Sequence, residues 1–228
     1  MILFLSYIPL WLLALLLWVL LRRRAYLVCP WFFAYAVFGV VSDATRFVTH
    51  NYPHSYFATY WITEAGYCLL GILAMYEVLS SALGKLPSSW WVHLIFPFIL
   101  LTSLGLSLAR THASPPRVTG LLFWIVTGQI AVRLVQVSIF AGLATLVPLI
   151  GLRWRQYPFG VAMGFGFFAT IELLSTARFV DLGPTFKFMW GVISIAAYSV
   201  AVLIWIWFFW ARAKVTDPES RILGPVLR

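Results

Sequence analysis

The sequence has very little charge. Of its 228 residues only 10% are Asp, Glu, Lys or Arg, and 62% are hydrophobic, whereas soluble domains carry roughly 25% charged residues. A water-soluble fold of this size cannot cover its surface with so few charges. The composition therefore excludes an ordinary cytosolic enzyme, a secreted disulfide-rich domain and a disordered chain. It predicts a polytopic membrane protein.

Cysteine and histidine are scarce as well. Cys29 and Cys68 both lie in apolar stretches without a CxxC spacing, so we expect no disulfide. His50 and His54 have the i,i+4 spacing of a helical metal site, but Pro53 between them favours a loop. A membrane zinc or haem site needs further ligands within the apolar segments. The sequence therefore predicts no metal site.

Catalytic motifs are missing too. The sequence contains no HExxH, GxSxG, P-loop or dinucleotide-binding glycine pattern. The glycine-rich stretch 160–166 opens an apolar segment, so we expect Gly160 and Gly164 to serve close helix packing. The net charge of +9 comes from residues that flank apolar segments, which argues against a nucleic-acid partner. We expect a protein without catalytic activity.

Long apolar segments dominate what is present. A bilayer core of about 30 Å needs roughly 20 apolar residues in a helix. Seven segments meet this length: 2–21, 27–48, 56–82, 90–109, 118–150, 157–179 and 186–210. The sequence thus predicts an all-α bundle of seven transmembrane helices over 1–214, followed by a short flexible cytoplasmic tail over 215–228. The fifth segment is too long for a straight span, so the depth of Arg133 is not fixed by the sequence.

Basic residues predict the orientation. With the N-terminus outside, ten of them lie on the inner side: Arg22, Arg23, Arg24, Lys85, Arg153, Arg155, Arg212, Lys214, Arg221 and Arg228. Five lie on the outer side: Arg46, Arg110, Arg117, Arg178 and Lys187. This bias predicts an outside N-terminus and a cytoplasmic C-terminus in the cytoplasmic (inner) membrane. The first segment has no basic region before it and no cleavage site after it, so we interpret it as a membrane helix and not as a signal peptide.

The layout of seven spans with an outside start resembles that of microbial rhodopsins, small sugar exporters and receptor-like sensors. A retinal protein needs a lysine in the middle of its last span. Here Lys187 stands at the start of that span, and 188–210 has no lysine. We therefore expect no cofactor, although an apolar ligand or a lipid fits the composition.

Ionisable residues within spans are costly and usually face the bundle interior or a wet cavity. Glu64 lies about two turns, roughly 10 Å, from the outer end of the third segment. Arg133 on the fifth segment is the central cation, and its expected counter-ions are Glu64 and, on the sixth segment, Glu172. Together with neighbours at helical spacing, these residues predict an ion-pair or ligand pocket in the outer half of the bundle. Its expected members are Glu64, Arg133, Glu172, Tyr60, Thr63, Tyr67, Gln129 and Gln136.

A second group of charges lies near the outer ends of the spans. Asp43 and Arg46 form an i,i+3 pair on the second segment, and Arg178 ends the sixth. We interpret these three as an outer polar cluster. The sequences 45–48 (TRFV) and 177–180 (ARFV) are similar, which is the pattern expected of parallel repeats. Glu77, near the inner end of the third segment, reads as an interfacial carboxylate.

These features favour a sensor or receptor that binds a small or lipid-soluble ligand in the pocket. A secondary transporter, possibly proton-coupled, is the alternative, and a structural subunit of a larger membrane complex is the third. The buried charges can also simply fix helix register. The partners we expect are the lipid bilayer and a membrane or cytoplasmic protein that carries the signal. The sequence does not decide whether the chain forms a homo-oligomer.

Overall fold

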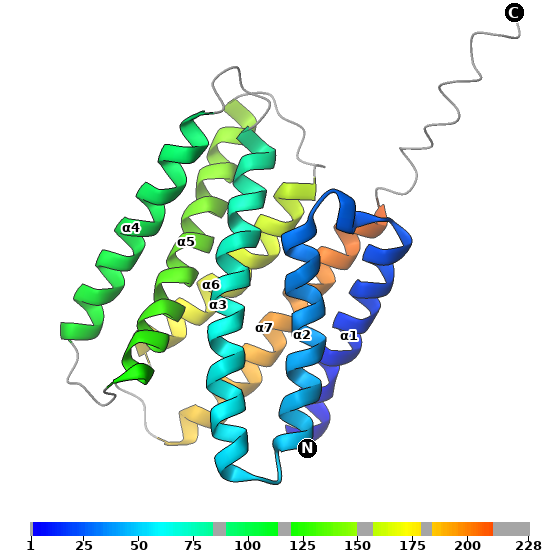
Figure 1. Cartoon of the computed structure of the whole chain (residues 1–228), viewed down its shortest axis with the longest axis vertical. Helices are drawn as coiled ribbons and strands as arrows, with labels where there is room; N and C mark the ends of the chain where they lie inside the picture. Colours follow the sequence, from blue (N-terminus) through cyan, green and yellow to red (C-terminus); the bar gives the residue numbers. More distant parts are fainter. Residues whose placement is uncertain (1, 84–89, 114–119, 150–156, 179–183, 212–228) are drawn as a thin grey trace, which may run out of the picture.

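The computed structural model describes residues 2–83, 90–113, 120–149, 157–178 and 184–211, and these are helical apart from short turns (Figure 1). The α-helices in them are α1 (Ile2–Arg22), α2 (Pro30–Thr49), α3 (Pro53–Leu83), α4 (Trp90–Ala113), α5 (Leu121–Leu149), α6 (Tyr157–Arg178) and α7 (Pro184–Ala211). A 3-10 turn, η1 (Ala25–Leu27), precedes α2. The all-α prediction is confirmed, and each helix covers one predicted segment. The predicted tail over 215–228 lies outside the described residues.

Five of the described helices, α3 to α7, are long and apolar enough to cross a membrane. In α1 the stretch Ile8–Arg22 is a shorter apolar helix, and α2 carries Asp43 and Arg46 near its end. Large apolar side chains point outward from the bundle, with Trp11 74% and Phe98 68% exposed. Such a surface is unsuited to water. The apolar helices therefore indicate a membrane-embedded bundle, while the number of crossings stays a prediction.

Successive helices run in opposite directions, as Figure 1 shows. We call the end of the bundle that holds the turn between α2 and α3 the α2–α3 end, and the opposite end, which holds η1, the α1–α2 end. Helix α1 packs on α2 and α7, and α3 packs on α2, α5 and α6. Helix α6 packs on both α5 and α7. Six helices thus enclose a common interior.

Helix α4 lies outside this group. It packs mainly on α5 and makes a smaller contact with α3. Ser103 and Ser107 on α4 are buried, and the Ser107 hydroxyl donates to the Thr127 carbonyl oxygen of α5 over 2.6 Å. A polar stripe therefore joins α4 to α5, buried Phe96 joins it to Tyr76 of α3, and apolar residues such as Leu101 and Leu106 face outward.

Aromatic side chains fill the half of the interior toward the α1–α2 end. The Phe32 ring on α2 packs edge-on against Trp205 of α7, with centroids 5.1 Å apart, and Tyr35 packs edge-on against Phe165 of α6 at 4.9 Å. All four residues are buried. Such edge-to-face pairs add to the stabilisation from burial alone. Tyr35 also lines a cavity described below, so it marks where dense packing ends.

Glycines on α6 bring α7 close. A Cβ at Gly164 would lie 2.7 Å from Trp205 Cδ1, and one at Gly160 would lie 2.7 Å from Phe208 Cβ. Without those Cβ atoms, the Trp205 Nε1 donates to the Val161 carbonyl oxygen over 3.2 Å. The predicted packing role of Gly160 and Gly164 is confirmed.

Glu77 corrects one expectation. Its side chain on α3 is only 8% exposed, so it is buried within the bundle and does not face solvent. Its oxygens accept hydrogen bonds from the backbone amides of Trp31 (3.3 Å) and Phe32 (3.0 Å) in the first turn of α2. Helix N-termini have unpaired amides and a positive dipole end, both of which favour a carboxylate. Glu77 therefore caps α2 from a neighbouring helix.

Candidate functional site

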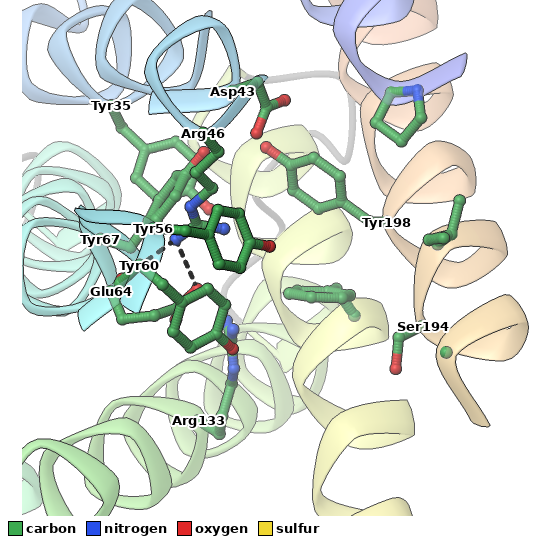
Figure 2. A pocket seen from close by; sticks show the side chains of 14 residues that line it. Tyr35, Asp43, Arg46, Tyr56, Tyr60, Glu64, Tyr67, Arg133, Ser194 and Tyr198 are labelled. Carbon is green, nitrogen blue, oxygen red and sulfur yellow. Dashed lines mark hydrogen bonds and ion pairs between the residues drawn. The ribbon is translucent and has the colours of Figure 1, made fainter. Parts of the chain in front are cut away.

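A polar cavity of about 590 Å3 lies among the six helices (Figure 2). Helix α2 contributes two charged side chains to its lining, and α3, α5, α6 and α7 contribute polar or aromatic ones. The lining residues are Pro9, Tyr35, Asp43, Arg46, Tyr56, Tyr60, Glu64, Tyr67, Arg133, Phe168, Gly191, Ser194, Ile195 and Tyr198. We call this space the main cavity.

A side cavity of about 340 Å3 adjoins it. The two cavities share the residues Tyr60, Glu64, Arg133, Phe168 and Ser194. The side cavity adds Gln129 and Glu172, which the main cavity lacks. The predicted pocket residues from the third, fifth and sixth segments thus meet around one polar interior.

Helical spacing places these side chains. On α3, the residues Tyr56, Tyr60, Glu64 and Tyr67 follow one another at intervals of four, four and three, which puts them on one face. All four line the main cavity. Thr63 lies on the adjacent edge of this face and is buried, and its hydroxyl donates to the Tyr60 carbonyl oxygen of its own helix.

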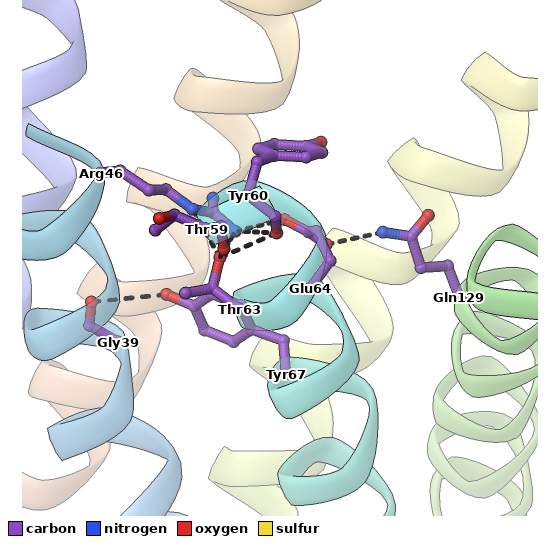
Figure 3. A network of polar contacts seen from close by, with 8 residues as sticks. All are labelled: Gly39, Arg46, Thr59, Tyr60, Thr63, Glu64, Tyr67 and Gln129. Atoms are coloured by element: carbon purple, nitrogen blue, oxygen red, sulfur yellow. Dashed lines mark hydrogen bonds and ion pairs between the residues drawn. The ribbon is translucent and has the colours of Figure 1, made fainter. Parts of the chain in front are cut away.

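Glu64 joins three helices through its two carboxylate oxygens (Figure 3). Its Oε1 lies 2.8 Å from Nη2 of Arg46 on α2, and both side chains are at most 20% exposed. Its Oε2 accepts a hydrogen bond from Nε2 of Gln129 on α5 over 2.7 Å. The carboxylate is therefore occupied on both oxygens, and it ties α2, α3 and α5 together.

Arg46 is held by α3 in three further ways. Its Nε donates to the Thr63 hydroxyl over 2.8 Å. Its guanidinium carbon stands 4.7 Å from the ring centre of Tyr60 and 5.7 Å from that of Tyr67. Cations are attracted to aromatic faces at these distances. The Tyr67 hydroxyl in turn donates to the Gly39 carbonyl oxygen of α2 over 3.5 Å, so the α2–α3 contact is polar on both sides of the ion pair.

The expected pairing of Arg133 with Glu64 is wrong. The ion pair that Glu64 makes among the described residues is with Arg46, because α2 packs along α3 and Gln129 fills the other oxygen. Arg133 lines both cavities. Its Nη1 donates to Gln136 Oε1 over 3.2 Å, and its guanidinium carbon lies 4.5 Å from the centre of the Phe168 ring.

The other predicted counter-ion of Arg133, Glu172, and the stripe residue Gln136 are placed differently from each other. Glu172 lines the side cavity together with Arg133, so the structure does bring these two residues to one space. Gln136 is fully buried and lies beside Gly71 of α3, where an added Cβ would meet its amide at 3.4 Å. The polar stripe of α5 thus points into the bundle, as the sequence predicts.

The outer polar cluster is only partly found. Asp43 is half-buried and lines the main cavity, but Arg46 points to α3 and pairs with Glu64 instead. In the part of the chain that the structure describes, Asp43 makes no hydrogen bond and no ion pair within 4 Å. The side chain of Arg178 lies outside the described residues, and so does the turn that follows it, so the similarity to 45–48 stays untested.

The sequence reasoning missed several cavity residues. Tyr56 continues the stripe of Tyr60 and Glu64 by one turn, and that spacing was a usable signal. Tyr35, Phe168 and Tyr198 carry no such signal, since they reach the cavity only through the packing of α2, α6 and α7. The Tyr198 hydroxyl is buried and makes no hydrogen bond within the described residues.

The described residues hold no group of three or more His, Cys, Asp or Glu side chains that can bind a metal ion. His50 and His54 are both exposed. Pro53 begins α3, and His50 belongs to the preceding turn. The two histidines thus do not share a helix.

No protein-family model, no curated protein and no solved structure matches the chain. Function is therefore inferred from the cavity itself.

Proposed function

We propose that the chain is a seven-span protein of the cytoplasmic membrane, with its N-terminus outside, that binds a small ligand in the main cavity and acts as a receptor-like sensor without catalysis. The alternating helix directions in Figure 1 and the ten-to-five bias of basic residues support the topology. In this orientation the α2–α3 end faces outward. The main cavity then lies on the outer side of the aromatic core.

One observation carries the proposal. Charged side chains from α2, α3 and α5 converge on a space of about 590 Å3, which falls within the range of roughly 300–1,000 Å3 for small-ligand pockets. Charges that serve only to fix helix register pair with one another and leave little space between them. Asp43 and Arg133 instead line an open volume without an ion pair to each other.

The same residues offer a route for a signal. Glu64 connects α2, α3 and α5, so a ligand that binds the cavity more tightly in one arrangement of these helices than in another shifts the balance between the two arrangements. Glu77 couples α3 to the start of α2 at the opposite end. A displacement of α3 against α2 is thus felt at the predicted cytoplasmic side, where a partner protein reads it.

Cysteine labelling tests the cavity directly. Ser194 lines both cavities, and Ser138 on α5 is exposed on the surface of the bundle. In a chain whose Cys29 and Cys68 are replaced by Ala, we expect Ser194→Cys to react with a membrane-impermeant methanethiosulfonate reagent added from outside. The matched Ser138→Cys, which the proposal places in lipid, should not react. Equal labelling of the two, or labelling of neither, would contradict a ligand cavity open to the outside.

A secondary transporter is the second candidate. Carboxylates of Asp43 and Glu172 line the two cavities, and such groups are frequent in intramembrane proton relays. Transport also requires a path past Tyr35 and the aromatic core toward the α1–α2 end. Flux of a solute into proteoliposomes under an imposed proton gradient would favour this candidate, and binding without flux favours the sensor.

A further inference from the structure

We propose that the ligand of the main cavity is a zwitterion, whose anionic group binds Arg133 and whose cationic group binds beside Asp43 among tyrosine rings. This inference rests on the proposed function, since it names the chemistry of the ligand for the same cavity.

The charges of Arg46 and Glu64 compensate each other within the protein. Arg46 contacts Glu64, Thr63 and two aromatic rings, and the second oxygen of Glu64 is taken by Gln129. The pair is neutral as a whole, and each oxygen of Glu64 already has a partner within the protein. It therefore forms a wall of the cavity and does not recognise the ligand.

Arg133 is the anion site. Its guanidinium has five N–H donors, yet the structure gives it one hydrogen bond, to the neutral amide of Gln136. The ring of Phe168 covers one face of the guanidinium at 4.5 Å, which leaves its edge for ligands. A planar guanidinium whose donors are free binds carboxylate or phosphate in bidentate fashion.

Asp43 is the cation site. Its carboxylate has no hydrogen bond and no ion pair within the described residues, and it lines only the main cavity. Tyr198 lies beside Asp43 in Figure 2, and both Tyr198 and Tyr56 line the main cavity but not the side cavity. A carboxylate beside aromatic rings is the setting in which ammonium groups, quaternary ones included, are bound. The buried Tyr198 hydroxyl adds a polar group to this end.

The two sites lie at opposite ends of the main cavity. Arg133 belongs to the wall that the main and side cavities share, whereas Asp43 belongs to the main cavity alone. Figure 2 shows the same separation, with Asp43 and Tyr198 on one side, Arg133 on the other, and Tyr60 and Arg46 between them. A ligand that carries both charges, separated by a short spacer, satisfies both ends at once. A soluble zwitterion and a zwitterionic lipid headgroup share this chemistry.

Binding measurements with matched probes test the inference. Glycerophosphocholine and 4-aminobutyrate are the soluble zwitterions. A zwitterionic headgroup is tested with nanodiscs of phosphatidylcholine, and nanodiscs of the anionic lipid phosphatidylglycerol serve as the comparison. Choline and inorganic phosphate represent the separate charges. Since a hydrogen bond to a charged group contributes about 1.5–3 kcal/mol, we expect at least one zwitterion to bind at least about tenfold more tightly than choline or phosphate. If every zwitterion binds no better than the separate ions, the inference is wrong.

Two variants test which end of the main cavity binds the anionic group and which binds the cationic group. Arg133→Gln should weaken the zwitterion and phosphate by about tenfold or more and leave choline unchanged, and Asp43→Asn should weaken the zwitterion and choline but not phosphate. The matched control is Arg22→Gln, an exposed arginine at the α1–α2 end. Equal effects of both variants on both ions would overturn the assignment.

Charge-selective labelling gives a readout that needs no ligand. With Ser194→Cys as the target, Arg133→Gln should slow an anionic methanethiosulfonate reagent, and Asp43→Asn should slow a cationic one, each relative to the other reagent. Labelling with the same ratio of rates in all variants would refute the zwitterion inference but leave the proposed cavity intact. No labelling by either reagent would instead refute the proposed function, so the two failures are distinguishable.

Discussion

Arg46 and Glu64 lie 18 positions apart, on the last turns of α2 and the first turns of α3, and their side chains meet at 2.8 Å. Sequence spacing offered Asp43 as the neighbour of Arg46 and Arg133 as the partner of Glu64. The observed pair instead follows from how the two helices pack after the turn at His50.

Arg46 and Glu64 should stabilise the fold jointly, so that the effect of replacing one depends on whether the other is present. Glu64→Gln and Arg46→Gln each leave one charge uncompensated, so each should lower the free energy of unfolding by about 1–3 kcal/mol. The double variant should lose less than the sum, by about 1 kcal/mol or more. Unfolding in mixed detergent micelles measures all three, with Arg22→Gln as the control. Strictly additive losses would show that the two residues do not interact.

Substitution of Arg133, unlike that of Arg46 or Glu64, should not destabilise the fold. It makes one hydrogen bond, to an amide, and an unpaired charge inside a membrane bundle is costly. We therefore expect Arg133→Gln to leave the unfolding free energy of the ligand-free protein within about 0.5 kcal/mol or to raise it, as substitutions at binding residues often do. The same unfolding assay compares it with Arg46→Gln. A loss as large as that of Arg46→Gln would mark Arg133 as a structural residue.

Glu77 should act on α2 alone. Its carboxylate accepts two amides of the first turn of that helix, so Glu77→Ala should lower the unfolding free energy by about 1–2 kcal/mol, and Glu77→Gln by less. Amide hydrogen exchange should increase at Trp31 and Phe32 and not in the middle of α2. The control is Ser81→Ala, because Ser81 is an exposed residue on α3, the helix that carries Glu77. Unchanged exchange at both amides would contradict the cap.

The glycines of α6 and α5 make a matched pair of tests. Gly164→Ala places a methyl group against the Trp205 indole, and overpacking of this kind costs about 1–3 kcal/mol. An added Cβ at Gly142 on α5 meets nothing within 4 Å, so Gly142→Ala should be neutral or stabilise the helix by up to about 1 kcal/mol. Thermal unfolding followed by tryptophan fluorescence separates the two. Equal effects would mean that α7 does not lie closely against Gly164.

Cysteines in the two described turns test the orientation. Asn51 lies in the turn between α2 and α3, and Arg24 lies between α1 and η1; both are exposed. In the background without native cysteines, Asn51→Cys in intact cells should react with an impermeant thiol reagent, and Arg24→Cys should react only after the cells are broken. The reverse pattern would invert the proposed topology.

The helices were predictable because apolar segments of about 20 residues report membrane helices with little ambiguity. The polar face of α3 was predictable too, since the spacing of Tyr60, Glu64 and Tyr67 belongs to one helix. The contacts between side chains of different helices were not predictable from the sequence. Arg46 with Glu64 and Glu77 with the start of α2 depend on which helices pack together and at what height, and neither is encoded in the spacing of a single segment.

The position of α4 outside the six-helix group affects how the sequence of the bundle can change in evolution. Among the described residues, none that line either cavity come from α4, and the helix is anchored to α5 by one narrow row of hydroxyl groups. Its outward side chains can thus be exchanged without touching the chemistry of recognition. Under the proposed function, the outer face of α4 and the ligand site are therefore traits that selection can alter independently.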